Sequence, residues 1–229
     1  MATLLNPQIE HHLETIYKGT EVSDLTTLAS DLIGLMRLED VEPIKNRYIN
    51  HWDQEATVLI CYGDSILQSE QKPLATLKSF LDTYSKGVID GVHILPFYPF
   101  TSDDGFSVLD YSSVNPSLGE WEDIIAIAND YSLMADLVIN HCSARSMWFE
   151  NFIKDREPGR NFFYTASPED DLSAVVRPRT NSLLREVETA QGTQHVWCTF
   201  SHDQVDLNFK NPQVLKEFVN IIRQYLDHG

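Results

Sequence analysis

The stretch "LMADLVINHCS" (residues 133–143) contains an apolar run that surrounds one aspartate and ends on an amide and an imidazole. The run predicts a buried strand over residues 133–139, with Asp136 inside it and Asn140 and His141 at its end. Asp136 is then either a buried, paired structural carboxylate or part of a site, because an unpaired charge is costly to bury. His141 is either an ordinary loop histidine or a residue that binds a ligand.

Strand and helix patterns alternate in the chain before this stretch. β-Branched and apolar runs over residues 57–62 and 91–97 predict strands. Helical periodicity covers residues 73–85 and 117–132, the second with Ser117 as its cap. The series is therefore strand, helix, strand, helix, strand, which places the chain in the α/β class. Strands that are almost continuously apolar predict a parallel sheet buried on both faces.

The flanking segments have different patterns. Residues 1–55 are predicted to be helical and mostly amphipathic, and Ser23 and Asp24 are start signals for a helix. Residues 142–205 are polar, aromatic and irregular, and they are too many for an ordinary connection. We interpret them as an inserted subdomain or an active-site loop.

A last amphipathic helix is predicted to begin at Asn211 and Pro212, and Gly229 has the position of a C-cap before a further strand. Three β/α units cannot close a barrel, so they form either a small open sheet or the first part of a barrel. The long segment after the third strand favours the N-terminal portion of a TIM (β/α)8 barrel. The predicted divisions are a helical N-terminal extension (1–55), the first three barrel units (56–141), an inserted domain (142–205) and the third barrel helix (206–229).

Composition narrows the classes of function. Seventeen basic residues against thirty-four acidic ones give a net charge of −17, which makes a nucleic-acid partner unfavourable. Cys61, Cys142 and Cys198 have no paired spacing, and the two beside apolar runs, Cys61 and Cys142, are interpreted as small buried hydrophobic residues. The N-terminus lacks the pattern of a signal peptide, and no apolar run is long enough to span a membrane. The expectation is a cytoplasmic protein without a membrane partner.

Two short motifs carry candidate binding residues. "SDDGF" (102–106) is either a polar turn or a sugar-binding element, in which Asp103 accepts from hydroxyls and Phe106 supplies an aromatic platform. "VVRPRT" (175–180) contains Arg177 and Arg179, whose guanidinium groups suit phosphate, although surface salt bridges are the alternative. "DQVDLN" (203–208) is predicted to be a buried polar return from the inserted segment.

Together these segments resemble the α-amylase superfamily, glycoside hydrolase family 13. "DLVINH" is similar to the conserved region at the end of its third strand, "QVDLN" to the signature that ends its inserted domain B, and "SDDGF" to the element after its second strand. Within the superfamily, "GVHILPFYPFTSDDGFSVLDY" and "DLSAVVRPR" resemble the sucrose phosphorylase group. The helical leader, with "IYKGT" and "NHWDQEATVLICYGDS", looks most like the glucosylglycerate phosphorylase branch.

The resemblance implies a role for each matching residue. Asp103 and His141 are expected to bind hydroxyls of the glucosyl unit, and Phe106 to stack beneath it. Arg179, with Arg177 near it, is expected on a mobile loop that meets phosphate or the acceptor. Gln204 is expected to face the acceptor side. Asp136 and Asn140 are expected to be structural residues that hold the geometry of the strand end. The substrates would be a small-molecule α-glucoside and phosphate as co-substrate, with no metal or organic cofactor.

The resemblance also implies that the bond-breaking groups are missing. Enzymes of this kind are retaining and use two carboxylates, one as nucleophile and one as acid and base. In the family the nucleophile is on the fourth strand and the acid–base residue follows the fifth, whereas this sequence stops after "QYLDHG". The chain alone is therefore expected to be inactive, as an N-terminal fragment of an α-glucosyl phosphorylase.

Two alternatives to this reading stay open. One is an α-glucosidase-type hydrolase of the same family, and the other is a non-catalytic fragment that binds sugar or complements a C-terminal chain. The segment "TNSLLREVET" (180–189) lacks the prolines that the family has there, which leaves the acceptor open among fructose, a sugar phosphate, glycerate and glycerol.

Overall fold

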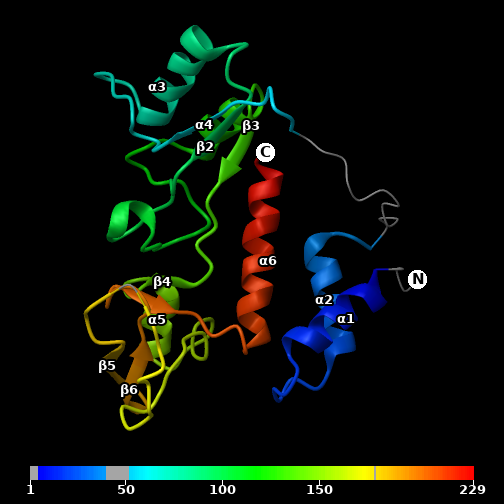
Figure 1. Cartoon of the computed structure of the whole chain (residues 1–229), viewed down its shortest axis with the longest axis vertical. Coiled ribbons are helices and arrows are strands. Elements are labelled where there is room, and N and C mark those ends of the chain that lie inside the picture. The colour runs from blue at the N-terminus through cyan, green and yellow to red at the C-terminus, as the bar shows by residue number, and fades with distance from the viewer. Residues whose placement is uncertain (1–4, 40–51, 178) are drawn as a thin grey trace. The chain divides into compact units, whose positions relative to one another are not determined.

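The computed structural model describes residues 5–39, 52–177 and 179–229 (Figure 1). By their contacts the residues form two compact units, one of residues 1–54 with 209–227 and one of residues 55–208 with 228–229. Pro178, which separates the two arginines of "VVRPRT", lies outside the described residues, and so do residues 1–4 and 40–51 of the predicted helical extension (1–55).

The first unit, called the helical unit below, contains α1 (Asn6–Ile16), α2 (Leu25–Met36) and α6 (Pro212–Asp227). Asp24 caps α2, because its Oδ1 accepts a hydrogen bond of 3.0 Å from the amide of Thr27, which confirms the predicted start signal. The apolar cluster joins all three helices: Leu13, Tyr17, Leu28, Ala29 and Leu32 are buried, and Leu215 and Val219 of α6 pack against them. The last helix of the chain therefore packs on the helical leader.

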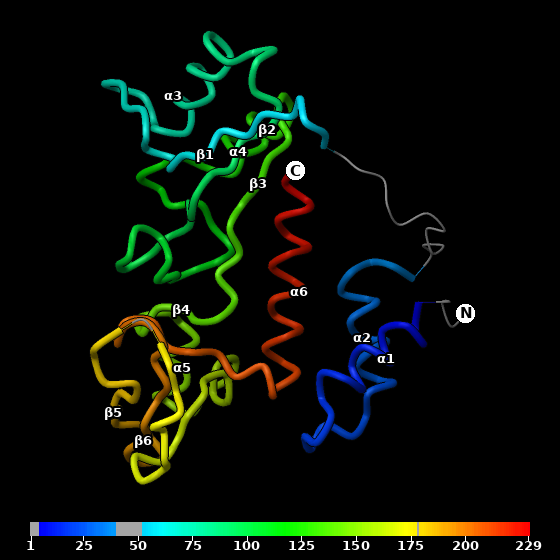
Figure 2. Tube along the Cα trace, viewed as in Figure 1, coloured from blue at the N-terminus to red at the C-terminus, as the bar shows by residue number. Residues whose placement is uncertain are grey.

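The second unit begins with three parallel strands in the order β1-β2-β3 (Figure 2): β1 (Val58–Cys61), β2 (Gly91–Ile94) and β3 (Ser132–Ala135). α3 (Pro73–Phe80) connects β1 to β2, and α4 (Trp121–Ala128) connects β2 to β3. The predicted alternation of strand and helix is confirmed. Each strand is shorter than predicted, and β3 ends at Ala135, so that Asp136 follows the strand and does not lie inside it.

One prediction about the sheet is wrong. The strands were expected to be buried on both faces, but Val58, Ile60 and Met134 are 52%, 62% and 54% exposed. Ile60, His93 and Met134 are direct neighbours in the parallel register, and alternate residues of a strand point to the same side of a sheet. On this side of the sheet Ile60 and Met134 are therefore more than half exposed and His93 is partly buried, while Val92 and Ile94 are fully buried.

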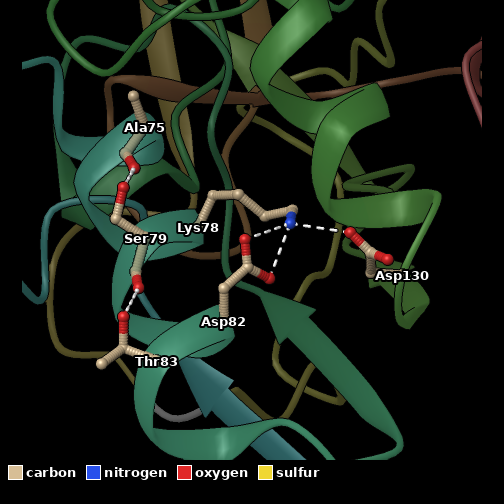
Figure 3. Close-up of polar contacts among 6 residues, drawn as sticks. All are labelled: Ala75, Lys78, Ser79, Asp82, Thr83 and Asp130. Carbon is tan, nitrogen blue, oxygen red and sulfur yellow. Dashed lines mark hydrogen bonds and ion pairs between the residues drawn. The ribbon is translucent and has the colours of Figure 1, made fainter.

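The connecting helices contain two local features that sequence patterns do not show. α3 continues as a π-helix over Leu81–Ser85, and Lys78 joins it to the turn after α4, with its Nζ 2.6 Å from Asp82 and 2.7 Å from Asp130 (Figure 3). The predicted cap of the second helix, Ser117, is wrong. α4 begins at Trp121 with a capping box between Glu120 and Asp123.

The rest of the second unit is more regular than its sequence suggested. It contains β4 (His141–Ser143), α5 (Met147–Ile153), β5 (Leu184–Thr189), β6 (Gly192–Trp197) and β7 (Gln204–Asp206). β5 and β6 form an antiparallel hairpin, and β4 pairs antiparallel with β7. Buried side chains, among them Phe149, Phe162 and Phe163, give this part a core of its own. Across the part of the chain that the structure describes, no helix combines the length and apolarity needed to cross a membrane.

Candidate functional site

The loop after β2 carries Asp103 and Phe106. A bridge between Phe100 and Val108 closes this loop, and at its tip Asp103 and Asp104 have φ angles of 59° and 49°. Gly105 follows with a φ of 105°, and a Cβ there would lie 2.6 Å from the Cβ of Pro96. The glycine of "SDDGF" is thus required both by its backbone conformation and by the close approach of Pro96.

The β4–β7 pair brings together two segments that lie about sixty positions apart in the sequence. His141 is opposite Asp206, and Ser143 is opposite Gln204. Since the first strand of this pair directly follows "DLVIN" and the second is "QVD", the two predicted motifs meet across one antiparallel ladder. The end of the inserted segment (residues 204–206) therefore pairs with its beginning (residues 141–143).

His141 is 5% exposed, and its Nε2 lies 3.0 Å from the carbonyl oxygen of Phe106. A carbonyl can only accept, so Nε2 carries the hydrogen and Nδ1 of the neutral ring is left as an acceptor for the amide of Asn140, at 3.3 Å. Burial lowers the pKa of His141, an effect that the bond to Phe106 and the charges of Asp206 and Asp103 oppose. For His141 to bind a sugar hydroxyl through Nε2, the hydroxyl has to replace the Phe106 carbonyl.

Asp103 is joined to the same pair of strands through Gln204. The Nε2 of Gln204 donates a hydrogen bond of 2.8 Å to Oδ2 of Asp103, and Gln204 is only 2% exposed. One oxygen of the carboxylate is thus held by the protein. The predicted role of Gln204 on the acceptor side stays a prediction, but the structure adds a role that the sequence did not indicate, which is orientation of Asp103.

The two arginines of "VVRPRT" have different surroundings. Arg177 contacts backbone carbonyls, with Nη1 3.2 Å from the oxygen of Thr199 and Nη2 bonded to the oxygen of Asn181. The guanidinium carbon of Arg179 lies 5.6 Å from the ring centroid of Phe200, whose ring is 5.0 Å from that of His141. Arg179 is thus the arginine next to the His141 cluster, while Arg177 anchors its own loop.

The two predicted structural residues, Asp136 and Asn140, lie on the segment between β3 and β4. Oδ2 of Asp136 is 3.0 Å from Nε2 of His93 on β2, and the hydroxyl of Tyr98 donates to the Asp136 carbonyl. Asn140 is exposed, and its carbonyl accepts from the amide of Leu207 at 2.9 Å. Asp136 is therefore a paired carboxylate, half-buried, whose partner the sequence did not reveal.

Sequence reasoning missed three residues of this cluster. Asp206 is 8% exposed and accepts from the amide of Thr199 at 3.0 Å. It could have been selected from the sequence, because it is the carboxylate of the motif "QVDLN". No sequence pattern indicates Phe200, which contacts both Arg179 and His141. The third residue is Asp203, whose carboxylate binds the loop after β2.

A cavity of about 350 Å³ opens at the carboxyl ends of β1 and β2, where Tyr62, Asp64, Phe100 and Asp104 contribute to its lining. Ligand sites of parallel α/β folds lie at this end of the strands. No group of three or more His, Cys, Asp or Glu residues that could hold a metal ion exists among the described residues. The three cysteines are free, and burial raises the pKa of Cys142 and of Cys198 to about 12.

Comparisons with known proteins agree with this geometry. The family model of the alpha-amylase catalytic domain matches residues 75–229. The glucosylglycerate phosphorylase of Spirochaeta thermophila is 51% identical over 177 residues, which cover 77% of this chain and 30% of that protein. The glucosylglycerate phosphorylase of Escherichia coli is 40% identical over 227 residues, which cover 98% of this chain and 40% of that protein.

Among solved structures, the sucrose 6F-phosphate phosphorylase of Thermoanaerobacter thermosaccharolyticum superimposes on this chain with a TM-score of 0.68 at 29% identity. The superposition covers 76% of this chain and 38% of the phosphorylase chain. The chain spans about 30–40% of the length of the curated relatives cited above. Identity is higher to the glucosylglycerate phosphorylases than to the sucrose 6F-phosphate phosphorylase, as the leader sequence predicted. The three β/α units, with their insertion, are the N-terminal portion of a TIM barrel, and the chain belongs to the alpha-amylase family through its catalytic domain.

Proposed function

We propose that this chain carries the glucosyl-binding part of a retaining α-glucosyl phosphorylase, which transfers a glucosyl group reversibly between an α-glucoside and phosphate. The observation that carries the proposal is the β4–β7 pair, which gathers His141, Asp206 and Gln204 beside the loop of Asp103. Such a cluster of carboxylates, amides and a neutral imidazole offers several donors and acceptors to sugar hydroxyls.

The residues of this chain have binding and positioning roles in the proposal. Asp103, with one oxygen held by Gln204, accepts from a hydroxyl of the glucosyl unit, and a second hydroxyl takes the place of the Phe106 carbonyl at Nε2 of the neutral His141. The ring of Phe106 supplies an apolar surface beneath the sugar. The resemblance assigns the two carboxylates of the retaining reaction to later strands of the barrel, so this chain alone releases no glucose 1-phosphate.

Arg179 is the proposed contact for phosphate or for an anionic acceptor. Its guanidinium group lies over Phe200, which in turn contacts His141, so its charge is next to the predicted glucosyl site. Relatives at 40–51% identity are named glucosylglycerate phosphorylases, and glycerate carries a carboxylate that a guanidinium group binds well. We therefore favour glucosylglycerate as the α-glucoside. Three further expectations stay predictions. They are a complementing C-terminal chain, a reaction that needs no metal or organic cofactor, and a cytoplasmic location.

The first test is binding of α-D-glucose 1-phosphate to the purified 229-residue chain, followed by calorimetry or by ligand-observed NMR. We expect Asp103→Asn and His141→Asn to weaken binding about tenfold or more, because each removes a charged or oriented partner of a hydroxyl. Asp171→Asn is the matched control, since this exposed carboxylate accepts from the amide and the side chain of Ser173, two residues along the chain. Binding that is unchanged in both site variants would contradict the proposed site.

The second test separates phosphorolysis from hydrolysis. The chain is extended by the barrel region that its relatives possess, and Arg179→Ala is compared with the parent in both reactions. We expect a larger loss in phosphate-dependent release of glucose 1-phosphate than in release of glucose, while equal losses would favour a hydrolase. Glucose 1-phosphate formed by the unextended chain would contradict the assignment of the reacting carboxylates to later strands.

A further inference from the structure

The loop after β2 needs support from outside itself. Asp103 and Asp104 are non-glycine residues in the left-handed region, directly before Gly105, which is also at positive φ. Residues with side chains adopt this conformation at an energetic cost and keep it only where surrounding contacts over-determine it. The backbone bonds inside the loop, from Thr101 to Ser107 and from Phe106 to Asp103, close the turn but do not attach it to the rest of the unit.

Asp203, one residue before β7, supplies that attachment. Its Oδ2 accepts from the hydroxyl of Thr101 at 2.6 Å, from that of Ser102 at 2.6 Å and from that of Ser107 at 3.0 Å. The Ser107 hydroxyl is also 2.9 Å from the backbone oxygen of Asp203. All three donors belong to the loop that carries Asp103 and Phe106, and they lie on both sides of its strained tip.

The proton count of this network favours an ionised Asp203. Each hydroxyl has one hydrogen to donate, and a carboxyl group offers acceptors alone, with no O–H of its own to place, only when it is ionised. Ser143 of β4 lies 2.8 Å from the Thr101 hydroxyl and can donate to it, which frees the hydrogen of Thr101 for Asp203. The network therefore joins the loop, β4 and the residue before β7 through one carboxylate.

The backbone around Asp203 is itself fixed. The carbonyl oxygen of Asp203 accepts from the amide of Ala144 at 2.9 Å, and the amide of Ser143 donates to the carbonyl of Val108 at 2.8 Å. The side chain of the next residue, Gln204, holds Asp103. Asp203 thus connects a rigid ladder to a strained loop, which is the arrangement expected of a residue that orients others.

We propose that Asp203 is a positioning residue, whose carboxylate holds the loop of residues 101–107 against the β4–β7 pair and so places Asp103 and Phe106 for the sugar. The assignment of a sugar to this place rests on the proposed function. The attachment of the loop does not, and the two can be tested separately. Asp203 itself needs no contact with the ligand.

The charges that face Asp203 come from several elements. Burial would raise its pKa, but the bonds from Ser102, Thr101 and Ser107 lower it, with a contribution from the charge of Arg145. Asp103 and Asp104 belong to the loop that Asp203 binds, and His202 is its neighbour in the chain. Arg185, on β5, donates to the carbonyl of His202 at 2.7 Å.

The experiment measures amide hydrogen exchange in the 229-residue chain for Asp203→Ala, Asp203→Asn and the control Asp171→Asn. For Asp203→Ala we expect exchange at Thr101, Phe106 and Ser107 to rise about tenfold or more, since bonds to a charged acceptor are lost. The β5–β6 amides serve as the reference for overall folding and should not change. Asp203→Asn keeps one acceptor oxygen and should rescue part of the protection.

A pH series supplies a readout that a purely packing role would not move. The lowered pKa means that the carboxylate holds the loop at pH values above its ordinary pKa of about 3.9 and releases it as the pH falls through the lower, folded value. Loop exchange relative to the β5–β6 amides should therefore rise in the parent as the pH falls below about 3.9, and stay flat in Asp203→Asn.

Two outcomes overturn the proposal: loop exchange in Asp203→Ala that stays within about twofold of the parent, or a pH series that is identical in the parent and Asp203→Asn. Titration with α-D-glucose 1-phosphate then tests the consequence, and Asp203→Ala should bind it several-fold more weakly. If the parent chain binds no glucose 1-phosphate while loop exchange responds as expected, the proposed function fails and the positioning role of Asp203 stands.

Discussion

The helical unit and the candidate site are stabilised by different kinds of contact. In the helical unit, α1, α2 and α6 share one apolar cluster, and the polar contacts, such as the ion pair of Lys216 with Asp31, lie at its surface. At the candidate site the loop after β2 is attached by hydroxyls that converge on Asp203 and by the bond of Gln204 to Asp103.

This difference decides how each region should respond to change. The stability of apolar packing depends on the volume of the buried side chains and is insensitive to pH. The hydrogen bonds of the site depend on the direction of donor and acceptor and on the protonation of the carboxylates and of His141. Removal of buried methyl groups should therefore destabilise the helical unit most, and removal of an acceptor or a change of backbone conformation should destabilise the site most.

Truncation of Leu32 should damage the helical unit. Leu32 is 4% exposed in the apolar cluster, so Leu32→Ala should lower the free energy of unfolding by about 2–5 kcal/mol, through lost burial and a cavity. The measurement is urea unfolding together with residue-resolved hydrogen exchange, which should rise in α1 and α2. Leu226→Ala makes the same change at a side chain that is 64% exposed and should cost less than about 0.5 kcal/mol. Equal costs for the two variants would refute the assignment of the cluster as the core of this unit.

A methyl group at Gly105 should break the loop of the candidate site. Gly105→Ala combines a positive φ with a Cβ only 2.9 Å from the carbonyl oxygen of Pro96, so we expect a loss of about 2 kcal/mol or more. Gly192→Ala is the matched control, because Gly192 has a similar φ of 101° with nothing within 4 Å of an added Cβ, and should cost about 1 kcal/mol. Thermal and urea unfolding give both values. A smaller loss at Gly105 than at Gly192 would show that the approach of Pro96 is not limiting.

Protonation of His141 should weaken the site gradually. Burial lowers its pKa in the folded chain below the ordinary value of about 6.5, so the neutral ring contributes stability above pH 6.5 that is lost as the pH falls toward the folded value. The free energy of unfolding measured from pH 7 to pH 5 should therefore fall more steeply in the parent than in His141→Asn. The difference is at most about 1.4 kcal/mol per pH unit, the limit for one proton. Parallel pH profiles for parent and variant would exclude a lowered pKa at this residue.

Much of the fold could be predicted because it depends on local patterns. The periodicity of apolar residues identified α3, α4 and α6 but not α5, and Asp24 identified the start of α2. The parallel sheet followed from the alternation of strands and helices. The length of β3 could not be predicted, because Leu137 to Ile139 are as apolar as the strand but have no ladder partner there. The exposed face of the sheet was also missed, since a pattern of apolar residues does not show what covers them.

Sequence motifs predicted several residues of the candidate site, but not the hydrogen bonds and ring contacts that join them. Asp103, His141 and Gln204 were selected from their motifs, and the structure brings all three into one cluster. Arg177 and Arg179 have the same pattern in the sequence but different surroundings, one among backbone carbonyls and one over Phe200. Asp203 was overlooked because a single carboxylate before a strand is indistinguishable from a surface residue until its partners are known.

The amino-acid sequence was enough to predict the α/β class, because that class depends on the local spacing of apolar residues. The family and the types of residue at the site came from the resemblance of short motifs. Which donor meets which acceptor became known only from the folded structure. Asp203 and the loop hydroxyls are about one hundred positions apart, as are Gln204 and Asp103. A hydrogen bond depends on distance and direction in space, and only the folding of the inserted segment back onto His141 brings those atoms within reach.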